Sequence, residues 1–180
     1  MQKMSAVKKS IITAVCIALC VVLPQAFHAV PNAGAIYLPM HIPVLLCGLI
    51  TGPVTGFICG LAGPLISSLL TGMPASAMLP SMMAELAVYG LVTGLMCTFV
   101  KFTKPSVTVY VALVTALLAG RVVGGLLKAL IFSAGSYSLS VWFTSYFVTC
   151  LPGIIIQLIF VPAVMIALEK ARLIPPLESR

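Results

Sequence analysis

The sequence is poor in charge, and acidic residues are the scarcest of its charged types. Only 7% of its residues are charged, and its three acidic side chains are Glu85, Glu169 and Glu178. Soluble domains carry roughly a quarter of charged residues, so a soluble catalytic domain is excluded. Apolar residues make up 61% of the 180, and the mean hydropathy is +1.21. The composition therefore predicts an integral membrane protein, and the length predicts a single transmembrane domain, 1–180.

Several chemical motifs are also missing. There is no phosphate-binding glycine loop, so the chain itself is not expected to hydrolyse ATP. The six cysteines lie inside apolar runs without Cys-x-x-Cys spacing, and they are interpreted as small apolar packing groups. No Ser-His-acid set and no cluster of metal-binding residues is present, so neither a catalytic residue, a metal site nor a cofactor is predicted. A binding or transport role fits the sequence better than an enzyme.

The basic residues indicate the topology. The net charge is +7, but all basic residues except Arg121 and Lys128 lie just outside long apolar runs. They form three segments, namely Lys3, Lys8 and Lys9, then Lys101 and Lys104, then Lys170, Arg172 and Arg180. The positive-inside rule places such segments in the cytoplasm, and with them both termini. The basic charge therefore does not indicate nucleic-acid binding.

The apolar runs predict an all-α bundle of six transmembrane helices. The expected spans are approximately 10–30, 40–52, 54–72, 80–100, 107–133 and 142–168. Residues 10–30 are interpreted as a retained helix, because His28 occupies the small-residue position of any signal-peptide cleavage site before Ala29. Residues 40–52 measure only about 20 Å as a helix, against a hydrocarbon core of about 30 Å. A re-entrant hairpin over 40–72, which would leave four crossings, is therefore the alternative.

Glycines recur at every fourth position in several of these spans. The series comprises Gly48, Gly52, Gly56 and Gly60, then Gly90 and Gly94, then Gly120 and Gly124. Small residues at this spacing let helices approach closely in lipid, and packing within the chain is the expected use.

A few polar side chains fall within the expected spans and are candidates for a site. They are Glu85, Arg121, Lys128 and Gln157, with His41 at the outer mouth of the second span. A charge inside a membrane costs about 3 kcal/mol or more, so each needs a partner or a water-lined cavity. Tyr89 follows Glu85 at i+4, and Arg121 and Lys128 are seven residues apart, so each pair shares a helical face.

Two interpretations of these charges remain open. In one, Glu85 forms an ion pair with Arg121 or Lys128 that joins the fourth span to the fifth. In the other, the two cations outnumber the single carboxylate and leave a surplus positive charge. The surplus would suit a carboxylate or phosphate substrate in a cavity that opens outward. Aromatic residues gather at the outer end and form either an interfacial belt or a stacking wall for a ring-bearing ligand. They are Tyr37, Tyr137, Trp142, Phe143, Tyr146 and Phe147.

The stretch 38–90 resembles the substrate-binding S components of energy-coupling factor (ECF) transporters, which are prokaryotic vitamin-uptake proteins. The similarity begins with Leu38-Pro39-Met40-His41-Ile42-Pro43-Val44-Leu45 and continues through Gly52-Pro53, Gly63-Pro64, Leu70-Thr71-Gly72-Met73-Pro74 and Glu85-Leu86-x-x-Tyr89-Gly90. It extends over nearly the whole chain in the six-span pattern, the cytoplasmic termini and the small size.

The resemblance implies a multi-pass subunit of an ABC importer in the prokaryotic plasma membrane. It would capture a vitamin or related micronutrient near the outer surface and dock onto a scaffold transmembrane subunit with two cytoplasmic ATPases. In that family an Ala-x-x-x-Ala motif on the first helix makes the docking face, and Ala14 and Ala18 match it. The surplus cations favour an anionic vitamin, such as pantothenate, niacin or a folate, without identifying it.

The candidate substrate-binding residues are His41, Glu85, Tyr89, Arg121, Lys128, Tyr146 and Gln157. Two other functions remain open from the sequence. One is a self-sufficient small secondary transporter or channel for a small anionic solute, which needs no ATPase partner. The other is an accessory subunit that binds no ligand.

Overall fold

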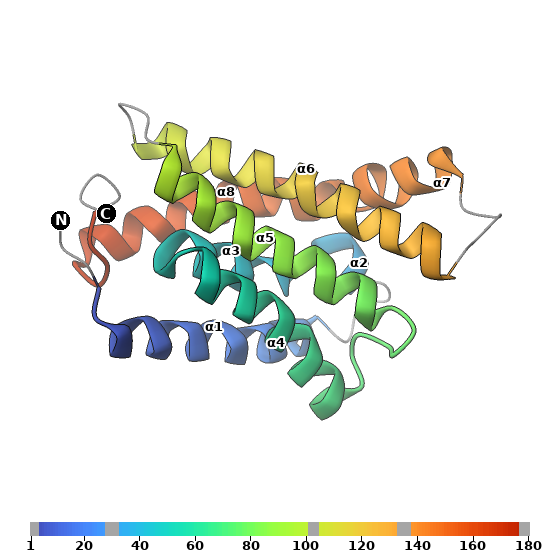
Figure 1. Cartoon of the computed structure of the whole chain (residues 1–180), viewed down its shortest axis with the longest axis horizontal. Helices are drawn as coiled ribbons and strands as arrows, with labels where there is room; N and C mark the ends of the chain where they lie inside the picture. Colours follow the sequence, from blue (N-terminus) through green and yellow to red (C-terminus); the bar gives the residue numbers. More distant parts are fainter. Residues whose placement is uncertain (1–3, 28–32, 101–104, 133–137, 177–180) are drawn as a thin grey trace.

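The computed structural model describes residues 4–27, 33–100, 105–132 and 138–176, and all its regular structure in these ranges is helical (Figure 1). The helices are α1 (Ala6–Ala26), α2 (Ala33–Tyr37), α3 (His41–Thr51), α4 (Pro53–Thr71), α5 (Leu79–Phe99), α6 (Pro105–Phe132), α7 (Leu139–Phe143), η1 (Thr144–Val148) and α8 (Leu151–Lys170). Six segments of the described chain are long and apolar enough to cross a membrane. The prediction of an all-helical protein with six spanning segments is confirmed.

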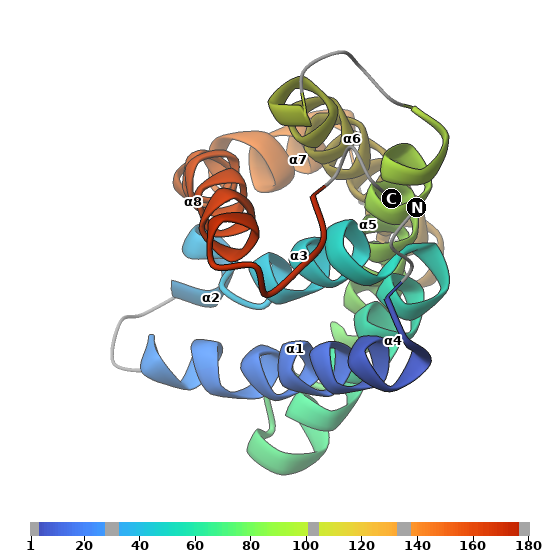
Figure 2. The same ribbon diagram turned by 90° about the vertical axis from the view of Figure 1, so that its left-hand side faces the viewer.

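The short helix α3 lies at the centre of the bundle. All eleven of its residues are buried, and it contacts α1, α4, α5 and α8. Figure 2 shows it near the middle of the molecule, with α1 below and α8 to its left. Together with α2 it gives an apolar segment of 18 residues, Gly34–Thr51, which is longer than the expected 40–52. This length favours six crossings over the re-entrant alternative.

The segment expected as one sixth span, 142–168, is divided in the structure. A short helix α7 and one turn of π-helix, η1, precede a turn at Thr149 and Cys150, and α8 begins only at Leu151. Proline at position 152 fits the start of a new helix there, because in the first turn its missing N–H costs no hydrogen bond within the helix. The sequence prediction of a continuous helix from 142 was therefore wrong.

The glycine series brings helix backbones into direct contact. A Cβ atom at Gly90 of α5 would collide with the backbone of Gly56 on α4, and one at Gly48 of α3 would collide with Thr93 and the backbone of Gly90. Gly52 has φ of 105°, a conformation that favours glycine, and forms the tight turn between α3 and α4. These close contacts hold α3, α4 and α5 in one rigid unit.

Hydroxyl and thiol groups join α1 to the central helix. The Cys47 thiol of α3 lies 3.7 Å from the Thr13 hydroxyl of α1 and 3.4 Å from the Thr51 hydroxyl. Thr13 in turn donates to the backbone carbonyl of Lys9 at 2.8 Å. All six cysteines are buried and free, so they act as packing and weak hydrogen-bonding groups.

We expect Gly90→Ala to destabilise the protein by about 1–3 kcal/mol, because the added methyl group forces α4 and α5 apart. Thermal unfolding in one detergent measures the effect. Gly34→Ala in α2 is the matched control, since a Cβ there meets nothing within 4 Å, and it should unfold like the wild type. Equal melting temperatures for the two variants would contradict the close α4–α5 contact.

Candidate functional site

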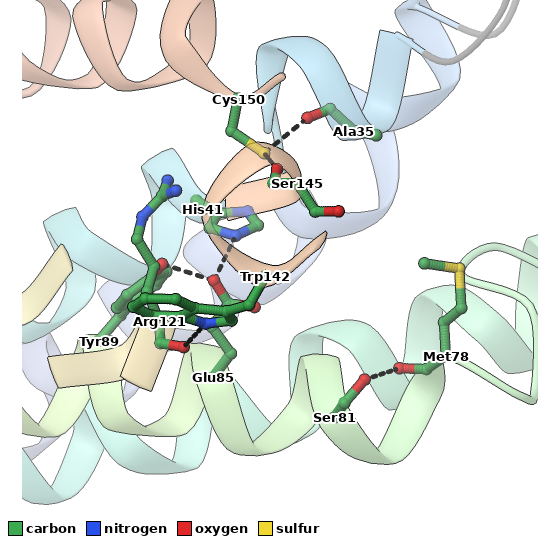
Figure 3. Close-up of polar contacts among 10 residues, drawn as sticks. All are labelled: Ala35, His41, Met78, Ser81, Glu85, Tyr89, Arg121, Trp142, Ser145 and Cys150. Atoms are coloured by element: carbon green, nitrogen blue, oxygen red, sulfur yellow. Dashed lines mark hydrogen bonds and ion pairs between the residues drawn. The ribbon is translucent and has the colours of Figure 1, made fainter. Parts of the chain in front are cut away.

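A buried polar cluster centres on the carboxylate of Glu85. The Tyr89 hydroxyl donates a hydrogen bond of 2.6 Å to Glu85 Oε1, and His41 Nε2 lies 3.8 Å from the same oxygen (Figure 3). The His41 and Tyr89 rings are 5.3 Å apart. All three side chains are at least nine-tenths buried. The cluster therefore brings together the start of α3 and one face of α5, as the i, i+4 spacing of Glu85 and Tyr89 predicts.

Two glycines of α6 let this helix lie directly against the cluster. A Cβ atom at Gly120 would collide with the Tyr89 ring, and one at Gly124 would press against the Glu85 side chain. The missing side chains let α6 lie directly against α5 at this level. Arg121, which follows Gly120, therefore lies on α6 next to the level of the Tyr89 ring.

Arg121 is the largest of the side chains that are fully buried, with 1% of its surface exposed. Among the described residues, its Nε, Nη1 and Nη2 atoms have no hydrogen-bond partner. The ring of Phe147 covers the guanidinium, with Cζ 5.5 Å from the ring centroid. The buried cation thus has an aromatic neighbour while all its donor groups stay unused.

An ion pair between Glu85 and Arg121 or Lys128, one of the two interpretations that the sequence leaves open, does not form within 4.0 Å in the described part of the chain. The Tyr89 hydroxyl and His41 Nε2 instead lie beside the Oε1 atom of Glu85. Figure 3 shows the Arg121 guanidinium directed away from the carboxylate. Lys128, two turns further along α6, is half-buried. The interpretation as an internal ion pair was wrong for these side chains as the structure places them.

Gln157 of α8 is a second buried group without partners. None of its surface is exposed, and neither its amide oxygen nor its amide nitrogen has a hydrogen-bond partner among the described residues. Gly153, one turn earlier on α8, packs against the backbone of Ile36 and Tyr37. The face of α8 that carries Gln157 therefore points toward the segment that leads into His41.

The α7–η1 segment lies over Arg121 and is anchored at both ends. The Trp142 indole N–H donates to the Arg121 carbonyl oxygen at 3.2 Å, and a Cβ at Gly125 would collide with the indole. The Cys150 thiol lies 3.0 Å from the Ser145 carbonyl and 3.2 Å from that of Ala35. The segment thus joins α6 to α2 and to the start of α8.

Aromatic rings of this segment pack against one another beside the guanidinium. Trp142 lies 5.4 Å from Phe147 and 6.4 Å from Tyr146, and Phe143 stacks on Phe147 at 5.3 Å, all between ring centroids. Tyr146 itself is half-buried, and Tyr137 lies outside the described residues. Sequence reasoning grouped these rings by position but missed that Phe147 faces Arg121 and that Trp142 binds its backbone.

Ala14 and Ala18 lie elsewhere, on the exposed face of α1. Their larger neighbours on that helix, Ile11 and Val15, are 58% and 53% exposed. The two alanines therefore form a shallow surface on the outside of the bundle, whereas Thr13, Cys16 and Cys20 face inward.

The fold and the cluster together define a helical membrane protein with unsatisfied polar groups at its core. A family model for the substrate-specific component of ECF transporters matches residues 8–165. The chain belongs to this family, so it is a substrate-binding subunit of a transporter in the prokaryotic plasma membrane and not an enzyme. No curated protein and no solved structure matches the chain.

We expect Tyr89→Phe to lower the free energy of unfolding by about 1–3 kcal/mol, because Glu85 then loses a buried hydrogen bond. Thermal unfolding in detergent measures the change. Tyr110→Phe on α6 is the matched control, because Tyr110 is 46% exposed and the loss of its hydroxyl should have little effect. If both variants unfold at the wild-type temperature, the Tyr89–Glu85 bond does not stabilise the fold.

Proposed function

We propose that this S component captures a small anionic vitamin or related micronutrient at the outer face of the membrane. It delivers this substrate together with a scaffold transmembrane subunit and two cytoplasmic ATPases. The observation that carries the proposal is the guanidinium of Arg121, which is buried without a hydrogen-bond partner among the described residues. Family membership supports the role as a substrate-binding subunit.

A buried cation without a counter-ion is an expensive feature. Several kcal/mol are lost when a charge leaves water, and a guanidinium regains them best from a planar carboxylate that accepts two parallel hydrogen bonds. The Phe147 ring lies over the guanidinium, and the Nε, Nη1 and Nη2 donors have no hydrogen-bond partner among the described residues. A substrate carboxylate would therefore supply the interaction that Arg121 lacks.

The local charges favour a substrate with one negative charge. Arg121 and Lys128 contribute two positive charges and Glu85 one negative charge, so their sum is +1 when His41 is neutral. A monoanion brings this sum to zero, whereas a doubly charged phosphate would leave a net negative charge in a poorly solvated site. This comparison favours a carboxylate over a phosphate monoester.

The proposed orientation follows from the ends of the bundle. The start of α1 and the end of α8 lie at one end of the molecule, where Lys8, Lys9, Lys170 and Arg172 are found. Helix α7 lies at the other end, and α2 lies in the half nearer to it (Figure 1). The positive-inside rule supports a cytoplasmic location for the basic end and thus for both termini. The polar cluster, at the start of α3, then lies in the outer half of a single transmembrane domain, 1–180.

The proposed docking surface is the exposed face of α1 around Ala14 and Ala18. Small side chains four residues apart allow a partner helix to approach closely in lipid, where no hydrophobic effect drives association. His41, Glu85, Tyr89, Arg121, Lys128, Tyr146 and Gln157 are the proposed substrate-binding residues, and none of them lies on α1. Docking and substrate binding are therefore separable by mutation.

We expect Arg121→Met to abolish substrate retention without destabilising the empty protein, since it removes an unpaired buried charge. The protein is purified after incubation with a deproteinised extract of growth medium, and retained molecules are identified by mass spectrometry. The wild type should retain a carboxylic acid. Arg172→Met, at an exposed site on the cytoplasmic side, is the matched control and should retain the same molecule.

Two outcomes would contradict a substrate role for Arg121. One is retention of an unchanged amount of the same molecule by Arg121→Met. The other is retention of an uncharged molecule by the wild type. A large fall in the melting temperature of empty Arg121→Met would show that the arginine holds the fold together instead.

We expect Ala18→Trp to reduce co-purification of the scaffold and ATPase subunits about tenfold or more. A large side chain at a close helix contact costs about 1–3 kcal/mol, and about 1.4 kcal/mol corresponds to tenfold in affinity. Affinity purification from membranes that contain all the subunits, followed by quantitative mass spectrometry, gives the ratio of subunits.

Ile159→Trp is the control for this variant, because Ile159 is 66% exposed on α8, a different helix of the bundle. It should preserve the complex, and both variants should retain the substrate. An intact complex in Ala18→Trp would rule out this face of α1 as the docking surface.

A further inference from the structure

The second group of unsatisfied polar atoms belongs to Gln157. Its amide offers a carbonyl acceptor and an N–H₂ donor, and both lack a partner in the described part of the chain although the side chain is fully buried. An unsatisfied buried amide destabilises a fold, so such a group in the core requires an explanation. The surrounding helix α8 is almost entirely apolar, which makes the cost larger.

Gln157 lies on the face of α8 that is directed toward the segment leading into His41. It follows Gly153 by one helical turn on the same face of α8, and Gly153 packs against the backbone just before His41. Gln157 is four residues, or about 6 Å, further along the helix axis than Gly153. Helix α8 contacts both α3 and α6. The Nδ1 atom of His41, at the start of α3, is also buried without a hydrogen-bond partner among the described residues.

We propose that Gln157 recognises an amide or lactam group of the substrate, so that the substrate is a carboxylic acid that also carries such a group. This inference rests on the proposed function, in which Arg121 binds the carboxylate. A primary amide or a lactam presents one donor and one acceptor on the same edge, so it satisfies both the carbonyl oxygen and the N–H₂ group of the glutamine with two parallel hydrogen bonds.

The pairing also sets the selectivity of the site. A site built to hydrogen-bond a polar group strongly rejects an analogue that lacks the group, because its own buried polar atoms are then left unpaired. A simple aliphatic or aromatic carboxylate satisfies Arg121 but leaves Gln157 unpaired. The carboxylate thus supplies the charge, and the amide distinguishes the substrate from other small acids.

A role in binding and a role in folding give opposite results for Gln157→Leu. If Gln157 serves only the substrate, replacing it by an apolar group of similar size leaves the empty protein as stable as the wild type or more stable. Affinity for the substrate then falls about tenfold or more, because the amide of the substrate is buried without a partner.

The experiment uses the molecule that the wild type retains from the growth-medium extract. Its affinity is measured by the fluorescence of Trp142, the single tryptophan of the chain, whose indole binds the backbone of Arg121. Wild type, Gln157→Leu and the matched control Gln25→Leu, at an exposed position on α1, are titrated with this molecule. An N-methylated derivative, which blocks the amide donor, is titrated against the wild type.

We expect Gln157→Leu and N-methylation each to weaken binding about tenfold or more, while Gln25→Leu has no effect. A retained carboxylic acid without an amide or lactam group would overturn this inference and leave the proposed function intact. Unchanged affinity in Gln157→Leu would do the same. A wild-type protein that retains no molecule, and whose fluorescence does not respond to the extract, would overturn the proposed function itself.

Discussion

The structure depends on the positive charge of Arg121, which is buried in the bundle with no carboxylate within 4.0 Å among the described residues. Arg121 is buried beside a carboxylate, yet the two do not pair within 4.0 Å. Tyr89 and His41 occupy Glu85, Phe147 covers the guanidinium, and Trp142 holds the Arg121 backbone. Together these contacts keep apart two charges that would otherwise neutralise each other. A buried charge in hydrocarbon is costly. The guanidinium nevertheless lacks hydrogen-bond partners among the described residues at the position where a substrate is proposed to bind.

The relative positions of Arg121 and Glu85 depend on helices that do not rotate or slide against one another. Small residues at the helix contacts fix the helices in this way. The backbones of α4 and α5 meet at Gly56 and Gly90, and α6 meets α5 where Gly120 and Gly124 face Tyr89 and Glu85. In lipid there is no hydrophobic effect between helices, so close van der Waals packing fixes their relative positions. The same glycines therefore account both for the stability of the bundle and for the depth at which Arg121 lies.

Hydropathy and periodicity sufficed to predict the six spanning segments, and the i, i+4 rule sufficed for the contact between Tyr89 and Glu85. The helix break at 149–150 was missed, although Pro152 in the first turn of α8 is a signal for it. The partner of Arg121 was not readable in this way. Whether it meets Glu85 or Phe147 depends on the rotation of α6 against α5 and on the return of η1 from a distant part of the chain, and neither leaves a local pattern in the sequence.

The central helix α3 contacts both the polar cluster and α1, the helix that carries the proposed docking surface. Its first residue, His41, belongs to the polar cluster, and Cys47, near its other end, contacts Thr13 of α1. On the proposed function, a bound monoanion would satisfy Arg121 and stabilise the loaded protein in proportion to ligand concentration. The loaded site would also carry no net charge. The empty site would keep its net positive charge, which makes any movement of the site through hydrocarbon costly. Neutralisation by the substrate would then favour transport of the loaded protein over the empty one, with no separate switch needed in the chain.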